Sequence, residues 1–414
     1  MRSLLNHRKF LRDRLICLPT FDRPDGICDF VFQVARDLAH QNVVIILALG
    51  ENWRGITGLK KWLRVIHRLR AFHSEKQQKE FLYLALLQLL PFQRSRVFQQ
   101  LNLKLNMLLL SSVLRLFFER RSRILWIFHP NDAKVLPAID LSKWHVHVDC
   151  VDWHTSANAN DSEQLHQQRL HLYKVAQTVT VLTKPAAQRV RKFFTKKIAI
   201  VPQGFDATSL SPSYLPARLI TKLIQQLQRK RKPIVGYFGG INARLDLDLL
   251  EEVISNAPQL HFVFVGPRDT DDSVPHEIEQ TQQLDRILRL PNLSYQSRVS
   301  RKDLYALMQN CAALIVPYAL QYEFNKCCFP MKVIEYFYAE RPVVSTSIPS
   351  LAQYKNLVTF ADTPEQFLTA LNTSVGSQLS EVHKRQAHQI AIGQTWTAKL
   401  DSVDVYLDKM LRSA

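Results

Sequence analysis

Short apolar runs alternate with helical patterns along this chain of 414 residues, and that alternation limits the possible folds more than any other feature. Short runs rich in Val, Ile and Leu suit parallel strands that are buried on both faces, and the helices between them complete βαβ units. The sequence therefore predicts an α/β fold with parallel sheets. The predicted strands are RLICLP (14–19), VVIILAL (43–49), ILWIFH (124–129), HVHVDC (145–150), TVTVL (178–182), IAIVP (198–202), PIVGYFG (233–239), HFVFVG (261–266), LSYQ (293–296), AALIVP (312–317), PVVST (342–346) and LVTFA (357–361).

A polar stretch that contains Pro and Ser follows VPQGFD (201–206) and divides this pattern into two halves. We place a domain boundary near 212–230, before the strand pattern starts afresh. A chain of this length with 46% hydrophobic residues is too long for one ordinary core and suits two domains of about 200 residues each. Because ligands in open α/β sheets bind at the carboxyl ends of strands, we expect a site in the cleft between the domains.

The alternation stops between 54 and 122, where we expect two or three inserted long helices. One of these is the basic segment 54–79, and another is the strongly apolar FLYLALLQLLPF (81–92). A long amphipathic helix over about 379–411 is predicted to close the chain.

The charge and the cysteines indicate the compartment and the class of partner. A formal charge of +18 predicts attraction to nucleic acid, anionic lipid or phosphorylated substrates. The six cysteines form no C-x-x-C pair and suit reduced, buried positions in a cytoplasmic protein, so no metal or disulfide framework is expected. The basic N-terminal stretch has too short an apolar run for a signal peptide, and no stretch reaches the ~18 consecutive apolar residues of a membrane helix.

The basic segment 54–79 is the clearest candidate for a surface partner. It holds eight Lys or Arg against one Glu, so it could lie on an anionic membrane, on the inner face of the plasma membrane. A helix that packs on its own domain with a solvated basic face is the equal alternative. Nucleic acid is a weaker option, because no recognised nucleic-acid module accompanies the segment. Its predicted apolar stripe consists of Leu59, Trp62, Leu63, Ile66 and Leu69, with Lys60, Lys61, Arg64, His67 and Arg68 on the remaining faces.

A proline, a lysine and a glutamate mark the segment 317–346, just beyond a predicted strand. Pro330 suits the first turn of a helix, where a missing N–H costs nothing. Lys332 and Glu335 then share one helical face near that N-terminus. A cation and a carboxylate in this position are typical of nucleotide and sugar sites in α/β proteins, and an ordinary surface ion pair is the alternative.

Two glycine-containing loops are further candidates for binding the same ligand. In GYFGGINARLD (236–246), Gly239 and Gly240 would allow backbone N–H groups to approach an anion, and Arg244 could bind a phosphate. Gly266, after the next strand, would allow close approach to a base or ribose. Simple turns are the alternative for both loops. The acidic DTDD (269–272) is interpreted as a solvated loop rather than a metal site.

Polar residues at strand ends in the first half could carry out acid–base chemistry. His129 ends one predicted strand, and Asp149, Asp152 and His154 lie at or just past the end of another. Each could instead be a helix cap or a satisfied structural group. The chain shows no Ser-His-Asp, Cys-His, H-E-x-x-H, Walker or G-x-G-x-x-G signature.

The sequence resembles the group-1 GT-B glycosyltransferases that build bacterial surface polysaccharides and glycolipids, above all those of the teichuronic-acid type. The stretches that carry the resemblance are VPQGFD (201–206), GYFGGINARLDLDLL (236–250), FVFVGP (262–267) and PMKVIEYFYAERPVVST (330–346), supported by the region around Trp396.

The resemblance implies two Rossmann-like domains facing across a cleft, with a helical insertion in the first. The implied units are an acceptor domain over 1–212, a nucleotide-sugar donor domain over 230–390 and a final helix over 391–414 that crosses back to the first domain. The group has two glutamates eight residues apart, but here the position eight before Glu335 is Cys327, and Glu323 lies nearby.

The resemblance also implies roles for individual residues. Glu335 would bind the ribose hydroxyls, and Arg244 and Lys332 would lie near the diphosphate. The expected donor-binding residues are Gly239, Gly240, Arg244, Gly266, Asn325, Lys332 and Glu335, and the expected catalytic residues are His129, Asp152 and Glu323.

We therefore expect a cytoplasmic glycosyltransferase, possibly peripheral on the membrane, that needs no metal and no cofactor besides its nucleotide-diphosphate-sugar donor. Its acceptor would be lipid-linked or a polysaccharide, and the family retains anomeric configuration. A nucleotide-sugar epimerase of the same fold and a non-catalytic GT-B-like binder of anionic surfaces are the alternatives.

Overall fold

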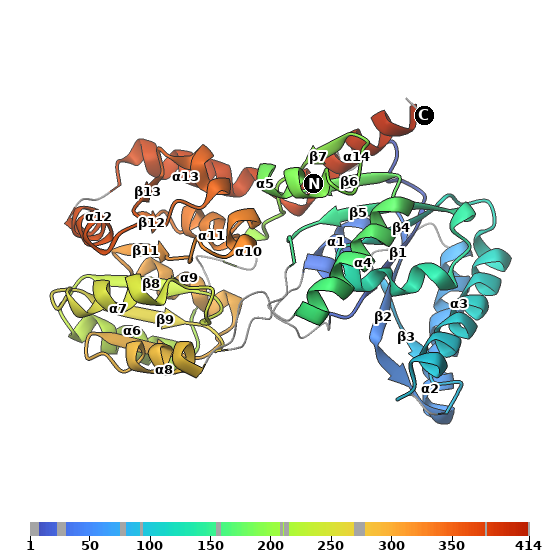
Figure 1. The fold of residues 1–414 in the computed structure, drawn as a ribbon, viewed down its shortest axis with the longest axis horizontal. Helices are drawn as coiled ribbons and strands as arrows, with labels where there is room; N and C mark the ends of the chain where they lie inside the picture. The colour runs from blue at the N-terminus through green and yellow to red at the C-terminus, as the bar shows by residue number, and fades with distance from the viewer. Residues whose placement is uncertain are drawn as a thin grey trace.

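Two parallel sheets with helices packed on their faces lie side by side in this computed structural model (Figure 1). Each sheet belongs to one domain, and helix α14 (Trp396–Arg412) lies beside the first. The structure describes residues 8–22, 30–74, 80–91, 94–154, 159–207, 210, 215–268, 278–376 and 379–412.

The first domain contains a seven-stranded sheet in the order β3-β2-β1-β4-β5-β6-β7. The strand order reverses between β1 and β4, which makes their carboxyl ends a switch point where ligands bind in such sheets. The strands are β1 (Leu15–Thr20), β2 (Val43–Trp53), β3 (Leu82–Leu87), β4 (Arg123–Ile127), β5 (Trp144–Cys150), β6 (Thr178–Val181) and β7 (Ile198–Ile200). The helices are α1 (Phe30–Leu38), α2 (Gly55–Ser74), α3 (Arg96–Phe118), the 3-10 helices η2 (Pro130–Ala138) and η3 (Leu141–Lys143), α4 (Ala159–Val175) and α5 (Lys184–Val190).

The second domain contains a six-stranded sheet in the order β10-β9-β8-β11-β12-β13, with its switch point between β8 and β11. The strands are β8 (Ile234–Phe238), β9 (His261–Val265), β10 (Leu293–Gln296), β11 (Ala313–Val316), β12 (Val343–Ser345) and β13 (Val358–Phe360). The helices are α6 (Arg218–Arg229), α7 (Leu247–Ser255), α8 (Ile278–Ile287), α9 (Arg301–Gln309), α10 (Glu323–Cys327), α11 (Lys332–Tyr338), the 3-10 helix η5 (Pro349–Tyr354), α12 (Pro364–Gly376) and α13 (Glu381–Gly393).

All twelve predicted strands are confirmed, and the prediction that only helices lie between 54 and 122 is wrong. Within the apolar segment 81–92, residues Leu82–Leu87 form β3, which pairs in parallel with β2. The alternation therefore continues through this region as β2-α2-β3-α3-β4. The error arises because periodicity alone cannot distinguish a short apolar strand from a segment of buried helix.

The prediction of one closing helix over 379–411 is also wrong, because the segment forms two helices. Helix α13 ends at Gly393, and α14 begins at Trp396. The Thr395 hydroxyl accepts a hydrogen bond from the Ala398 N–H at 3.1 Å, so Thr395 caps the new helix.

The chain crosses between the domains twice, and the two crossing segments are bonded to each other. The first is VPQGFD (201–206), and the second is the connection from α13 to α14. The Phe205 N–H donates to the Gln394 carbonyl at 2.7 Å, and the Gln394 side chain donates to the Gln203 carbonyl at 2.9 Å. A side chain at Gly204 would collide with Trp396, so the glycine permits this close crossing.

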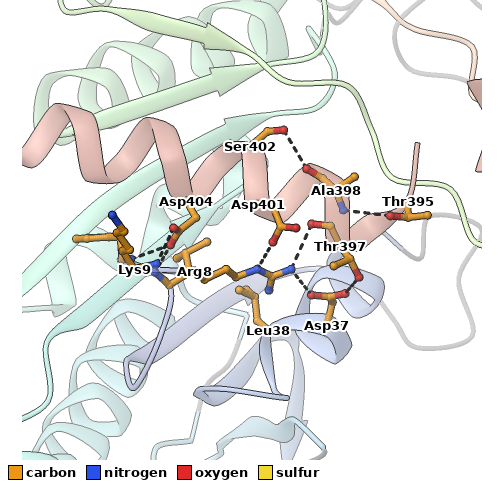
Figure 2. A network of polar contacts seen from close by, with 12 residues as sticks. Arg8, Lys9, Asp37, Leu38, Thr395, Thr397, Ala398, Asp401, Ser402 and Asp404 are labelled. Carbon is orange, nitrogen blue, oxygen red and sulfur yellow. Dashed lines mark hydrogen bonds and ion pairs between the residues drawn. The ribbon is translucent and has the colours of Figure 1, made fainter. Parts of the chain in front are cut away.

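Helix α14 is fastened to the N-terminal segment by charged groups (Figure 2). The Arg8 guanidinium contacts Asp401 at 2.6 Å and Asp37 of α1 at 2.8 Å. The Asp404 carboxylate accepts from the backbone N–H of Lys9 at 2.8 Å. The first and last described segments of the chain therefore belong to the same domain.

A buried ion pair joins the same helix to the first sheet. Lys399 of α14 lies 2.8 Å from Asp149 of β5, with side chains 1% and 0% exposed. The ammonium also donates to the Gln203 side-chain oxygen at 2.8 Å, and the Thr180 hydroxyl donates to Asp149 at 2.9 Å. Both charges are thus hydrogen-bonded as well as paired, as buried charges require.

The apolar stripe predicted for the basic segment divides between two faces of α2. Trp62 and Leu69 are buried in the first domain's core, whereas Leu59 and Leu63 are 48% and 52% exposed. The tryptophan therefore packs within the domain. Residues 75–79, the last part of the predicted segment, lie outside the described residues.

By length and composition alone, α3 is the one described helix that could cross a membrane. Its inner side is nevertheless part of the first domain, because Leu110 and Phe118 are buried in the core. The Asn102 and Asn106 amides each donate to the Leu87 carbonyl at 2.9 Å and hold the helix against the end of β3. Its outer side exposes Val97, Leu101, Leu105, Leu108, Leu109 and Leu116.

Replacing Lys399 with methionine should destabilise the first domain by about 3–5 kcal/mol, because Asp149 would remain as an uncompensated buried charge. Urea unfolding followed by tryptophan fluorescence measures the change. The double variant Asp149→Leu/Lys399→Met should recover most of the loss, since it removes both charges. Lys409→Met, exposed on the same helix, is the control and should change stability little. Equal unfolding midpoints for wild type and Lys399→Met would contradict the role of the pair.

Candidate functional site

The predicted donor residues gather at the carboxyl ends of β8 and β11, the switch point of the second sheet. Gly239 directly follows β8, and Tyr318 lies two residues past β11. In the first domain, His129 follows β4 at the corresponding switch point. Both sheets thus present chemistry at the position where α/β folds bind ligands.

Gly239 and Gly266 are required by the close packing of the first two loops. Their φ angles are +150° and +155°, which other residues rarely adopt. A Cβ atom on Gly266 would lie 1.8 Å from the Gly239 carbonyl oxygen, and one on Gly239 would lie 2.6 Å from the Lys332 ammonium. The Gly239 N–H donates to Val265 at 2.9 Å, so this glycine provides space next to Lys332 rather than an N–H for an anion.

Lys332 is held between two tyrosines. Its ammonium donates to the Tyr237 hydroxyl at 2.8 Å and to the Tyr318 hydroxyl at 2.9 Å, and it lies 4.2 and 4.7 Å from the centres of these rings. The Tyr237 hydroxyl in turn donates to the Gly240 carbonyl at 2.7 Å. Burial, and next the charge of Arg244, lower the pKa of Lys332 to about 7.

Arg244 lies over the ring of Phe324, with its guanidinium carbon 3.8 Å from the ring centre. Its Nε donates to the Asn325 side-chain oxygen at 3.1 Å. The Asn325 amide donates to the carbonyls of Arg244 and Ala319, both at 2.9 Å, and the asparagine is fully buried. Asn325 therefore positions Arg244 and its loop, and its amide is used within the protein.

Glu335 lies on the first turn of α11, as predicted. Its ion-pair partner, however, is Arg301 and not Lys332. Its carboxylate contacts the Arg301 guanidinium of α9 at 3.4 Å, and the glutamate side chain is only 13% exposed. Its charge also acts on Lys332, where it opposes the lowering of the pKa. The two residues thus form one electrostatic cluster with Arg244.

Two histidines of the first domain lie against each other at the edge of this cluster. The ring centres of His129 and His154 are 3.9 Å apart. His129 Nδ1 accepts from the Asn131 N–H at 2.9 Å, so the neutral ring carries its proton on Nε2. Burial, and then the charge of Arg169, lower the pKa of His129 to about 4, and burial also holds the pKa of His154 well below its usual value. Both rings are therefore neutral at pH 7.

Residues of the two domains meet in this region. The His154 ring lies 6.3 Å from that of Phe324, and the Arg244 charge contributes, behind burial, to the lowered pKa of His154. In the same way the charge of Asp152 contributes to the raised pKa of Tyr318. The structure thus brings His129, Asp152, Arg244 and Lys332 into one region.

Glu323 does not join this region. Its carboxylate pairs with Arg189 of α5, and the Cys327 thiol lies 3.5 Å from it. The Thr183 hydroxyl donates to the Cys327 carbonyl at 2.7 Å. Glu323, Arg189 and Cys327 line a separate hollow of about 420 Å³ between α5 and α10, so Glu323 contributes to a contact between the domains.

Sequence reasoning missed the residues that hold the others in place: Tyr237 and Tyr318 around Lys332, Phe324 under Arg244, and Arg301 beside Glu335. Tyr237 belongs to a buried strand, and its pattern predicted only burial. Asp149, a strand-end candidate, is part of the buried ion pair instead. Within the described part of the chain, no group of three His, Cys, Asp or Glu residues could hold a metal ion, and DTDD (269–272) lies outside it.

Two α/β domains, each with a parallel sheet and with switch points that face each other, define the GT-B architecture. Solved structures with a similar fold support this assignment. The structure of Alr3699/HepE from Anabaena in complex with UDP matches with a TM-score of 0.62 and 14% identity, over 97% of this chain and all of that one. Sucrose-phosphate synthase from Thermosynechococcus elongatus matches with a TM-score of 0.64 and 12% identity, over 97% of this chain and 100% of that one. This chain therefore has the GT-B fold.

The second domain also matches a family by sequence. Residues 232–376 match the family described as glycosyl transferases group 1. TuaH of Bacillus subtilis (strain 168), which carries the name of a teichuronic acid biosynthesis glycosyltransferase, is 28% identical over 184 residues. That match spans 44% of this chain and 44% of TuaH.

Binding of a nucleoside diphosphate should add a proton to Lys332 at pH 8. In the protein without ligand the pKa of Lys332 is about 7, and an adjacent diphosphate favours the charged form. Affinity for UDP should therefore fall as the pH rises above 7. Calorimetry in two buffers of different ionisation enthalpy measures the proton uptake. Lys332→Met should bind UDP more weakly and without uptake. A wild-type binding enthalpy that is the same in both buffers would contradict this assignment.

Proposed function

We propose that this protein is a glycosyltransferase that moves a sugar from a nucleotide-diphosphate donor to a lipid-linked or polysaccharide acceptor in cell-surface polysaccharide or glycolipid synthesis. The cluster of Lys332 and Arg244 beside Gly239 is the observation that carries the proposal. Two cations and a glycine at a switch point suit a diphosphate. The group 1 match and the UDP complex of Alr3699/HepE support this class of donor.

The site suits stabilisation of the leaving group. When the bond from the sugar to the diphosphate breaks, negative charge develops on the nucleoside diphosphate, and Lys332 and Arg244 can stabilise it without a metal ion. Glu335 suits the ribose hydroxyls. His129 and Asp152 lie on the opposite domain and suit contact with the sugar or proton transfer. Glu323 pairs with Arg189 in this structure, and its catalytic role stays a prediction. We propose a hexosyl donor and retention of configuration.

Glu335→Ala should weaken binding of the donor at least tenfold without unfolding the protein, because two charge-assisted hydrogen bonds to the ribose would be lost. A calorimetric screen of nucleotide sugars, starting with UDP-glucose, identifies the donor and then measures the variant. Glu340→Ala, a half-buried glutamate past the end of the same helix, is the matched control and should retain affinity.

Unchanged donor affinity in Glu335→Ala would contradict the proposed site. Incubation of the wild-type protein with the donor alone distinguishes a glycosyltransferase from a nucleotide-sugar epimerase, because an epimerase changes the sugar without an acceptor. A wild-type protein that binds vesicles but no nucleotide sugar would instead be a non-catalytic surface binder.

We also propose that the protein acts in the cytoplasm, peripherally on an anionic membrane, through the outer faces of α2 and α3. These two helices pack together at the edge of the first domain (Figure 1). On α2, Ile56, Leu59 and Leu63 are exposed among Lys and Arg side chains, and α3 adds its exposed leucines. Apolar groups ringed by cations suit an interface that contains anionic lipid.

Replacing Lys60, Lys61, Arg64 and Arg68 with glutamate should weaken binding to phosphatidylglycerol-containing vesicles more than tenfold, because each basic residue near such a surface contributes about 1 kcal/mol. Vesicle co-sedimentation measures the effect. The same four-fold charge reversal at Arg218, Lys222 and Arg229 of α6 and at Lys230, which follows it, is the control for net charge. If both variants lose binding equally, or neither does, α2 is not the membrane-binding surface.

A further inference from the structure

One tyrosine, Tyr318, contacts both cations of the proposed donor site. The Lys332 ammonium donates to the Tyr318 hydroxyl at 2.9 Å and lies 4.7 Å from the centre of its ring. The guanidinium carbon of Arg244 lies 5.3 Å from the same ring centre. Both distances are within the ~6 Å over which a ring attracts a cation. Two cations from different segments of the chain therefore share one aromatic ring.

The backbone of Tyr318 is fixed against the loop that carries Arg244. Leu245 and Tyr318 form an antiparallel bridge, and the Ala319 N–H donates to the Arg244 carbonyl at 3.0 Å. On its other side, the Tyr318 N–H donates to the Thr346 hydroxyl oxygen at 3.1 Å, and that hydroxyl donates to the Tyr318 carbonyl at 2.8 Å. The ring thus has a defined position relative to the arginine loop.

The two cations repel each other, so their closeness needs a cause. After burial, the charge of Arg244 is the second reason for the lowered pKa of Lys332. The face of an aromatic ring carries negative charge density, so the Tyr318 ring offsets part of this repulsion. The remaining titratable groups that act on or contact the lysine are Tyr237 of β8, Cys328 after α10 and Glu335 of α11.

The Tyr318 hydroxyl is a neutral partner for the lysine. Burial raises the pKa of Tyr318 to about 12, with the charge of Arg244 opposing the rise and that of Asp152 in the first domain adding to it. The hydroxyl therefore keeps its proton at neutral pH and accepts from Lys332 without being its counter-ion. A neutral anchor positions the cations without cancelling their charge, as a carboxylate in the same place would.

We propose that Tyr318 is a positioning residue of the donor site, whose ring and hydroxyl set the spacing of Lys332 and Arg244 so that one diphosphate contacts both. It acts through the two cations and not through a contact with the reacting atoms. This inference rests on the proposed function, because it names the residue that arranges that enzyme's diphosphate-binding cations.

Tyr318→Phe tests the hydroxyl, because it keeps the ring and removes an acceptor from Lys332. The ammonium is then less stabilised, so the pKa of Lys332 should fall and more of the lysine must gain a proton when UDP binds. Relative to wild type, UDP affinity measured by calorimetry should change little at pH 6 and fall about threefold or more at pH 8. Tyr354→Phe is the matched control, since its ring packs on Phe329 and Phe337 in the same domain.

Tyr318→Leu tests the shared ring, because it also removes the surface on which Arg244 lies. UDP affinity at pH 6 should fall about fivefold or more. In a protein that already carries Arg244→Met, the same substitution should have a clearly smaller effect, since one of the two cations is gone. Thermal unfolding verifies that each variant is folded. If Tyr318→Leu does not fold, the comparison of Tyr318→Phe at the two pH values decides.

The outcomes separate this inference from the proposed function. Suppose that the wild-type protein binds UDP. Tyr318 variants that keep wild-type affinity, or that lose the same factor at both pH values and with or without Arg244, would then overturn the positioning role and leave the glycosyltransferase intact. A wild-type protein that binds neither UDP nor a nucleotide sugar would refute the proposed function and this inference with it.

Discussion

The buried pair of Lys399 and Asp149 is the interaction on which the arrangement of the two domains depends. It fixes α14 to the first sheet and, through Gln203, to the first crossing between the domains. The second crossing is bonded to the first by Phe205 and Gln394. The relative position of the two switch points therefore follows from how this helix is held.

Cations and neutral histidines gather where the two domains meet. Lys332, Arg244 and Arg169 lie near two histidines that burial keeps neutral, so the cations add to one another. The low pKa of Lys332 reflects first its burial and then repulsion from Arg244, which the charge of Glu335 partly offsets. An incoming diphosphate would relieve that repulsion, so binding free energy and protonation are coupled at this site.

Sequence predicted the strands well because each is a short β-rich run between helical patterns. It failed at 82–87, where the run has no strand-specific period, and at 394–395, where only Thr395 indicates a new helix. The glycines, Arg244, Lys332 and Glu335 could be found because residue type alone indicates where the backbone is unusual and where charge lies. The partners Tyr237, Tyr318 and Arg301 could not, because they lie 14 to 95 residues from their targets and meet them only after folding.

The contacts between Arg8 and α14 have a topological consequence. Because the chain's first and last described segments lie in one domain, the second domain is a single uninterrupted insert within the first. Its two junctions lie next to each other, where Gly204 meets Trp396. The second domain is therefore an inserted domain whose two ends join the first domain at one place. One domain can therefore be exchanged without the other in evolution or engineering, by replacement of one segment at two adjacent positions.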